Sequence, residues 1–199
     1  GSSAGLSSSP DWVAEPDQAV AIFGYSVATA GDVNGDGCSD VIIGAIGYEN
    51  GQSGEGGAFV YHGSDSGLSV TPDLISESNQ EYAYFGWSVS SAGDINGDGY
   101  SDVILGAPFY DSIQSNVGAA FVYHGSDSGL SNIPDWSMKS GQTNDQFGYS
   151  VNTSGDVNGD GYSDIIVGII GYDNGQSNEG AAFVYHGSDS GLTTIPNWS

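Results

Sequence analysis

Short runs of apolar residues, separated by clusters of Gly, Asn, Asp and Ser, recur along the whole chain. In the middle of the chain, residues 85–90 alternate between the two faces of a strand, and 103–105 and 119–123 are short runs rich in β-branched and aromatic residues. Residues 134–138 form a weaker fourth run, whose proline suits the start of an edge strand. Such patterns are typical of strands and not of helices. The pattern therefore predicts an all-β chain.

The same group of runs occurs three times, with a period of 62 residues. A motif of Phe-Gly, an aromatic residue, Ser and Val occurs at 23–27, 85–89 and 147–151, and FVYHGS occurs at 59–64, 121–126 and 183–188. A further element begins with Ser-Gly-Leu, or Ala-Gly-Leu in the first copy, and ends at Trp12, Leu74, Trp136 and Trp198. Repeats of this length, each with an apolar face that needs a neighbour, predict β-propeller blades of four antiparallel strands. A stacked β-solenoid is the alternative, but its coils are usually much shorter.

The period divides the chain into an outer strand of another blade, within residues 1–15, and three blades at 16–77, 78–139 and 140–199. Three blades are too few to close a ring, because known propellers typically have four to eight. The outer-strand copies at 10–15 and 196–199 would leave exposed edges, which are liabilities unless they are paired. We therefore expect a fragment of a longer repeat array that self-associates. A homodimer of six blades, with strands exchanged at the junctions, is the simplest closure.

Between the first two predicted strands of each repeat lies an acidic loop of the form Asp-x-Asn-x-Asp-Gly-x-x-Asp, at 32–40, 94–102 and 156–164. Side-chain oxygens fall at its first, third, fifth and ninth places, and the seventh residue can offer its carbonyl oxygen, so that its side chain is free to vary. Calcium takes six to eight oxygen ligands, which a tight loop can supply from alternate positions. A plain hairpin turn is the alternative, since Asn-Gly and Asp-Gly favour turns, but a turn needs only one such pair.

The loop resembles the first nine places of an EF-hand loop, but the twelfth place holds Ile43, Leu105 and Val167 instead of a glutamate. The ninth-place aspartate is the expected substitute. We predict one structural Ca²⁺ per repeat, three in total, which fastens the hairpin. Cys38, Tyr100 and Tyr162 would bind through the backbone carbonyl. The complete predicted ligand set is Asp32, Asn34, Asp36, Cys38 and Asp40, then Asp94, Asn96, Asp98, Tyr100 and Asp102, then Asp156, Asn158, Asp160, Tyr162 and Asp164.

The combined motifs resemble the FG-GAP repeat family, which supplies the propeller blades of integrin α subunits and occurs in many bacterial secreted proteins. The FG pair is present in all three copies, whereas Gly-Ala-Pro is intact only at 106–108 and reads Gly-Ala-Ile at 44–46 and Gly-Ile-Ile at 168–170. The resemblance implies the ninth-place aspartate as a ligand. It also implies a non-catalytic, extracellular scaffold, secreted or at the cell surface, that adheres to a protein or glycan partner.

Composition narrows the class of partner. One Lys or Arg stands against 25 Asp and Glu in 199 residues, for a formal net charge of −24. Such a charge repels nucleic acid and anionic membranes and favours cations. The 38% hydrophobic and 12% aromatic residues argue against a disordered tail. No run of residues is long and apolar enough for a membrane span.

Three histidines, His62, His124 and His186, stand beside Ser and Asp and suggest a catalytic triad. An active site normally occurs once, so three copies at a fixed period favour a structural role, and we predict no enzymatic activity. Trp12, Trp136 and Trp198 are expected to cover blade edges rather than stack on sugars. A sugar-binding lectin, or an accessory domain of a carbohydrate-active enzyme, is the alternative function. It would need a unique polar cluster, which the repeats do not offer.

Overall fold

The structure is a computed structural model that describes residues 7–196, and these residues form eleven strands and no helix. The first sheet consists of β1 (Phe23–Gly31), β2 (Asp40–Ala45), β3 (Gly57–Tyr61) and β4 (Leu74–Glu77). The second consists of β5 (Ser88–Gly93), β6 (Asp102–Ala107), β7 (Ala119–Tyr123) and β8 (Trp136–Lys139). The third consists of β9 (Phe147–Gly155), β10 (Asp164–Ile169) and β11 (Ala181–Tyr185). Neighbouring strands are antiparallel and follow chain order. The all-β prediction is confirmed.

Strand register is the same in every sheet. In the second sheet Val89 pairs with Leu105, which pairs with Phe121. The residues 62 positions earlier and later pair in the same way. Because paired residues point to the same face of a sheet, each sheet carries a row of apolar side chains across its strands.

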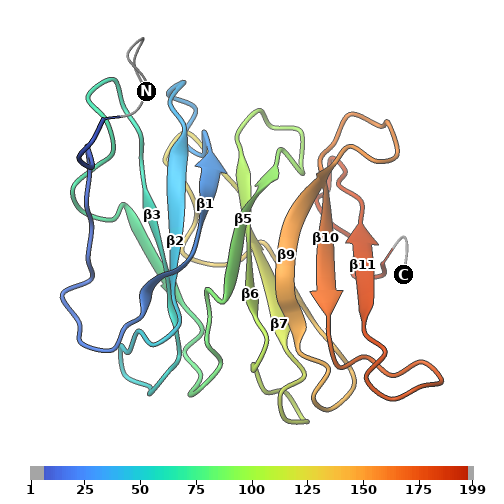
Figure 1. The fold of residues 1–199 in the computed structure, drawn as a ribbon. Coiled ribbons are helices and arrows are strands. Elements are labelled where there is room, and N and C mark those ends of the chain that lie inside the picture. The colour runs from blue at the N-terminus through green and yellow to red at the C-terminus, as the bar shows by residue number, and fades with distance from the viewer. Residues whose placement is uncertain (1–6, 197–199) are drawn as a thin grey trace.

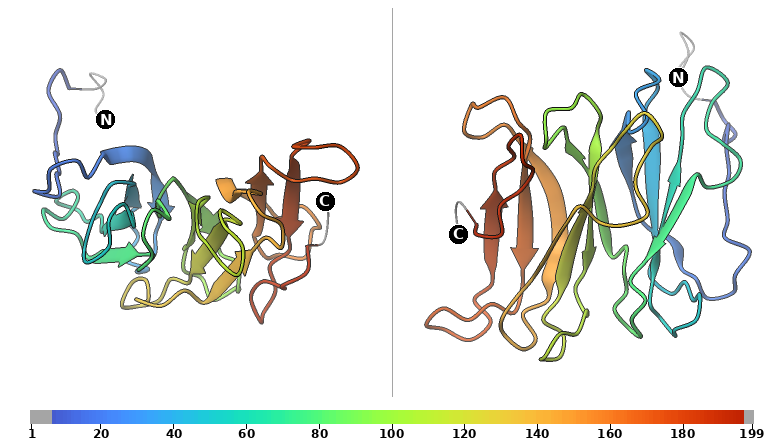
Figure 2. Two further views of the ribbon diagram at one scale, coloured as in Figure 1. Left: turned by 90° about the horizontal axis from the view of Figure 1, so that it is seen from below. Right: turned by 180° about the vertical axis from the view of Figure 1, so that it is seen from behind.

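The three sheets stand face to face in a curved row (Figures 1 and 2). Strands β1, β5 and β9, the first of each sheet, are in contact with their neighbours along the row. Two buried clusters fill the spaces between sheets: one joins Ile42 and Val60 to Phe85 and Leu105, and the next continues from the second sheet to the third. Each blade is therefore stabilised by burying its faces against its neighbours.

The row is open at both ends, so a closed propeller is not shown. Val27 of β1 is 68% exposed, whereas Val89 and Val151, its counterparts in β5 and β9, are 7% and 6% exposed. Val27 faces the side of the first sheet where no blade lies among residues 7–196. The third sheet has three strands among these residues, against the four expected. The exact division into blades, at 16–77, 78–139 and 140–199, stays a prediction.

Two expected strands differ in the structure. Residues 10–15 form no strand, because no sheet lies beside them to provide hydrogen-bond partners. The strand expected at 85–90 begins only at Ser88, and the N–H of Phe85 donates to Glu55 O in the preceding blade at 2.9 Å. Trp198 lies outside the described residues. In the part of the chain that the structure describes, no helix is long and apolar enough to cross a membrane.

Candidate metal centres

Each acidic loop connects the first strand of a blade to the second. The loops follow β1, β5 and β9, and their ninth residues, Asp40, Asp102 and Asp164, begin β2, β6 and β10. The three loops therefore lie at the same edge of their sheets, the upper edge in Figure 1. All three are at equivalent positions because the register is shared.

The first, third and fifth side chains of each loop are tied into one hydrogen-bond network. In the second loop the N–H of Asp98 donates to Asp94 Oδ1 and to Asn96 Oδ1, both at 3.1 Å. Asp94 Oδ2 accepts the N–H of Gly99 at 2.9 Å. The fifth-place aspartate accepts the N–H of Tyr100 at 3.0 Å. The corresponding bonds recur in the first and third loops.

The ninth-place aspartates are fully buried and connect distant parts of each blade. Asp102 Oδ2 accepts the N–H of Ile95 at 2.8 Å, and its Oδ1 accepts the N–H of Gly125 at 2.9 Å. Asp40 and Asp164 make the equivalent bonds. Each aspartate thereby joins the loop to the residues that follow the third strand.

Burial, with a smaller contribution from neighbouring negative charge, raises the pKa of two of these carboxyl groups. Burial raises the pKa of Asp102 to about 6, and repulsion from Asp98 adds to the rise, against the backbone N–H donors and His124, which lower it. Burial also raises the pKa of Asp40, with repulsion from Asp36 adding to it. By contrast, backbone donors, led by Gly161, lower the pKa of Asp156. No lysine or arginine of these loops supplies positive charge.

The structure brings the predicted ligands together only in part. Within residues 7–196, no group of three or more Asp, Glu, His or Cys side chains is placed to hold a metal ion. The first- and third-place side chains accept the same backbone N–H group. The ninth-place carboxylate accepts two other backbone N–H groups, one within the loop and one after the third strand. The donor chemistry fits a hard cation, since each loop offers three carboxylates, an amide oxygen and a carbonyl. A carboxylate oxygen that accepts one hydrogen bond also keeps a free lone pair.

The first and second loops are also fastened to the following blade. The N–H of Ser101 donates to Asp32 O at 2.9 Å, and the N–H of Ser126 donates to Val33 O at 3.1 Å. Asp94 and Ile95 accept in the same way from the third blade, from Ser163 at 2.9 Å and Ser188 at 3.1 Å. A change in loop geometry would therefore act on the stacking of blades.

Two of the seventh-place side chains make a contact that was not predicted. A Cβ added at Gly35 would lie 2.6 Å from Cε1 of Tyr100, and one at Gly97 would lie 2.6 Å from Cε1 of Tyr162. Each tyrosine ring therefore packs on the loop of the preceding blade. Spacing within one repeat carries no signal for this contact, because the partners belong to different repeats.

The histidines take part in strand-end contacts. The N–H of His62 donates to Asp73 Oδ2 at 2.7 Å, and Ser69 Oγ donates to the same oxygen at 2.5 Å. The hydroxyl thus bonds to the carboxylate. A catalytic triad would instead need the hydroxyl to bond to the imidazole. In the second blade the N–H of His124 donates to Asp135 Oδ2 at 2.8 Å. In both blades the bond uses the backbone N–H and not the imidazole.

A row of aromatic rings lies at the opposite end of the first strands from the acidic loops. The ring centroid of Tyr25 is 4.8 Å from that of Trp87, which is 5.4 Å from that of Tyr149. Tyr84 and Phe109 also contact Trp87. This row was not predicted from the sequence, although an aromatic residue follows Phe-Gly in every copy.

The FG-GAP repeat model matches residues 23–61, 85–123 and 147–185, more than half of the chain. Similar proteins include integrin alpha-5 of Xenopus laevis, 35% identical over 190 residues, which are 91% of this chain and 18% of that protein. Integrin alpha-6 of Homo sapiens is 33% identical over 161 residues, 81% of this chain and 14% of that protein. Integrin alpha-IIb of Mus musculus is 34% identical over 163 residues, 78% of this chain and 15% of that protein. The chain thus spans less than a fifth of these relatives.

Proposed function

Because this chain belongs to the FG-GAP repeat family, we propose that it is a calcium-binding, non-catalytic β-propeller module that acts outside the cell in adhesion. Its partner is a protein or a glycan. The similarity to integrin α subunits supports the adhesion role. The observation that carries the calcium assignment is the identical hydrogen-bond network of the three acidic loops.

The proposed ligands are the first, third, fifth and ninth side chains of each loop and the seventh carbonyl. Bound calcium would neutralise the carboxylates that now repel one another. The loops already hold their first and third oxygens toward a shared N–H group, so part of the site is ordered before binding. Sites in extracellular modules often have dissociation constants of roughly 10⁻⁴ to 10⁻³ M.

Thermal unfolding with and without calcium tests this proposal. At a hundredfold excess over its dissociation constant, a ligand of the folded state stabilises it by about 2.7 kcal/mol per site. We expect CaCl₂ at a hundredfold excess over this constant, about 10 to 100 mM, to raise the melting temperature of the EDTA-treated chain by more than ten degrees, because three sites contribute. Isothermal titration should give three ions per chain. A melting temperature that is the same in calcium and in EDTA would contradict the proposal.

Two variants distinguish calcium binding by the loops from non-specific attraction of calcium to the negative charge of the chain. Asp98→Asn removes a carboxylate of the second loop and should reduce the stoichiometry to two. Asp127→Asn removes the same charge from an exposed residue outside the loops and should leave three. Equal loss in both variants would point to diffuse counterion binding.

A glycan partner is the second candidate, and the aromatic row favours it, because tyrosine and tryptophan present apolar ring faces with a polar group. Tyr25 at one end of this row is 44% exposed. A glycan array would show binding that Trp87→Ala abolishes. Binding only to proteins would support the protein-adhesion form.

A further inference from the structure

The two junctions between neighbouring blades use the same backbone hydrogen bonds. At the first junction the N–H groups of the second blade donate to carbonyls of the first: Tyr82 to Ser53 at 2.9 Å, Tyr84 to Gly54 at 3.2 Å and Phe85 to Glu55 at 2.9 Å. At the second junction the donors and acceptors lie 62 residues further on: Asn144 to Ser115 at 3.0 Å, Gln146 to Asn116 at 3.1 Å and Phe147 to Val117 at 3.0 Å. Together with the loop contacts of the serines, each junction has five such bonds.

The two end blades carry the groups of one more such junction, the N–H donors on the first blade and the carbonyl acceptors on the third. The first blade offers the N–H groups at the donor positions, those of Val20, Ile22, Phe23, Ser39 and Ser64. The third blade offers the carbonyls at the acceptor positions, those of Asp156, Val157, Ser177, Asn178 and Glu179. No neighbouring blade lies beside either set among residues 7–196.

The backbone of the first blade already has the conformation of a junction. Val20 and Ile22 have φ of 64° and 54°, close to the 57° and 52° of Tyr82 and Tyr84, which donate across the first junction. Positive φ is strained for β-branched residues, and their side chains are 81% and 52% exposed. Such strain persists where the surrounding structure requires it, so the conformation indicates a missing neighbour.

Residues near Trp12 lie where the outer strand of a preceding blade would be. Trp12 Nε1 donates to Ser69 O at 2.9 Å, and its ring centroid is 4.9 Å from that of Tyr61. Trp136, in β8, makes the same contacts with the third blade, at 3.0 Å and 5.2 Å. Trp136 pairs with Val122 of β7, but no strand lies beside Trp12.

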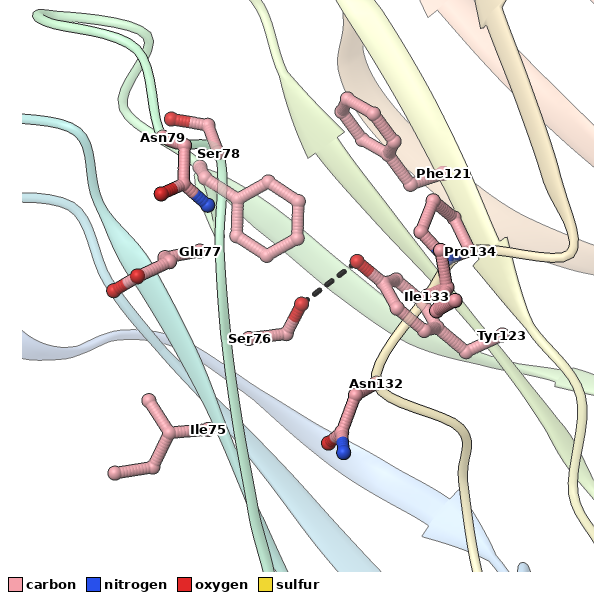
Figure 3. Close-up of a pocket in the computed structure, with 11 residues that line it drawn as sticks. Ile75, Ser76, Glu77, Ser78, Asn79, Phe121, Tyr123, Asn132, Ile133 and Pro134 are labelled. Atoms are coloured by element: carbon pink, nitrogen blue, oxygen red, sulfur yellow. Dashed lines mark hydrogen bonds between the residues drawn. The ribbon is translucent and has the colours of Figure 1, made fainter.

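The groove beside each outer strand repeats as well. Figure 3 shows the groove between β4 and the second blade, of about 400 Å³, where Ser76 Oγ and Tyr123 OH are 2.7 Å apart. A groove of about 270 Å³ separates residues 15–17 from the first blade. The segment that contains Trp12 therefore has the same position relative to the first blade as β4 has relative to the second blade.

Among residues 7–196, no fourth strand lies beside β11. All five residues of its counterpart β7 are buried, whereas Ala181, Ala182 and Phe183 of β11 are only partly buried. In the shared register, Val184 of β11 is equivalent to Val122 of β7, and would pair with a residue equivalent to Trp136. Trp136 corresponds to Trp198 in the third blade, which lies outside the described residues, and to Trp12 at the start of the chain.

We propose that the third blade of one copy of this chain docks on the first blade of a second copy, and that residues 12–15 of the second copy form the fourth strand beside β11. Two such junctions close a ring of six blades, the one multiple of three between four and eight. A second copy is the occupant because it supplies all five donors and the outer strand in matching positions. This inference goes beyond the proposed function.

Light scattering on the full 199-residue chain, over a range of concentrations, tests the ring. We expect twice the mass of one chain, with dissociation on dilution. Val27→Asp places a charge on the open face of β1 and should give a monomer whose circular dichroism matches that of the dilute wild type. The control Ile113→Asp, at a fully exposed site in the middle blade, should remain a dimer. A wild-type monomer at every concentration, masses that grow without limit, or a dimeric Val27→Asp would overturn the proposal.

A second measurement uses the native protein without substitution. Cys38 is the sole cysteine, partly exposed, and it holds the loop position at which Tyr100 and Tyr162 pack on the preceding blade. The ring would place it against the loop 156–164 of the other copy. Maleimide should therefore label Cys38 several times more slowly in concentrated than in dilute protein. An unchanged rate would contradict the docking even if Val27→Asp fails to fold.

Discussion

At the scale of single residues, aspartates act as hydrogen-bond acceptors for the backbone more than as members of ion pairs. Each ninth-place aspartate accepts two buried N–H groups, and each first-place aspartate accepts at least two more. Among residues 7–196 the structure shows one ion pair, between His62 Nδ1 and Asp73 Oδ1 at 3.7 Å. These carboxylates therefore have a structural role whether or not a metal is bound.

Asp102→Asn should separate the two roles. The amide has one acceptor oxygen where the carboxylate has two, so either Ile95 or Gly125 loses the buried partner of its N–H. We expect a loss of about 2 kcal/mol in the free energy of unfolding, measured by urea denaturation in EDTA, where metal makes no contribution. Asp127→Asn is the control and should change stability by less than about 0.5 kcal/mol. An Asp102→Asn variant as stable as wild type in EDTA would show that the carboxylate matters only for metal.

Glycine 97 tests the contact between loop and neighbouring blade. In Gly97→Ala the new Cβ would lie 2.6 Å from the Tyr162 ring, whereas in Gly159→Ala nothing lies within 4 Å. The φ values, 75° and 77°, are nearly equal, so backbone strain is matched. We expect Gly97→Ala to lose about 1–3 kcal/mol more than Gly159→Ala, as measured by chemical denaturation. Equal losses would mean that the tyrosine moves aside freely.

At the scale of elements, the outer strand of one blade is a packing element of the next. β8 closes the second sheet by pairing with β7, and at the same time Trp136 packs on Tyr185 of the third blade. The segment that contains Trp12 makes only the second kind of contact. Its tryptophan is partly buried, whereas Trp136 is 7% exposed.

Replacement of the two tryptophans should therefore have unequal effects. We expect Trp136→Ala to cost about 3–5 kcal/mol, the usual cost for a buried aromatic side chain. Trp12→Ala should cost clearly less in dilute protein, because its segment has no sheet behind it. Tryptophan fluorescence during urea unfolding would measure both. If Trp12→Ala costs as much as Trp136→Ala in dilute protein, the N-terminal segment is a full part of the single-chain core.

The sequence allowed prediction of contacts that lie within one repeat. Alternation around Val89 and the β-branched run 103–105 predicted the strands, and the acidic loops were placed correctly between them. Contacts between repeats were not predicted. The packing of Tyr100 on Gly35 and the bond from Phe85 to Glu55 depend on how sheets stack, which local periodicity does not encode. The aromatic row was missed for the same reason.

At the scale of the whole molecule, cohesion comes from repeated sheet-to-sheet burial along an open row (Figure 2). Each interior sheet face is covered, whereas the two ends of the row expose apolar residues, such as Val27 of the first blade and Val157 of the third. Exposed apolar surface at both ends of a repeat array favours association. The single chain therefore has the interior of a propeller without its closure.

The near absence of ion pairs among the described residues has a consequence for thermal stability at high salt concentration. Most proteins lose some attraction as dissolved ions screen opposite charges, but here screening acts almost only on repulsion among 25 acidic residues. The Debye length falls from about 10 Å at 0.1 M to about 3 Å at 1 M. We expect the melting temperature in EDTA to rise by several degrees between 0.1 M and 1 M KCl, as followed by calorimetry, and a fall would contradict this reading. The fold is thus suited to saline surroundings.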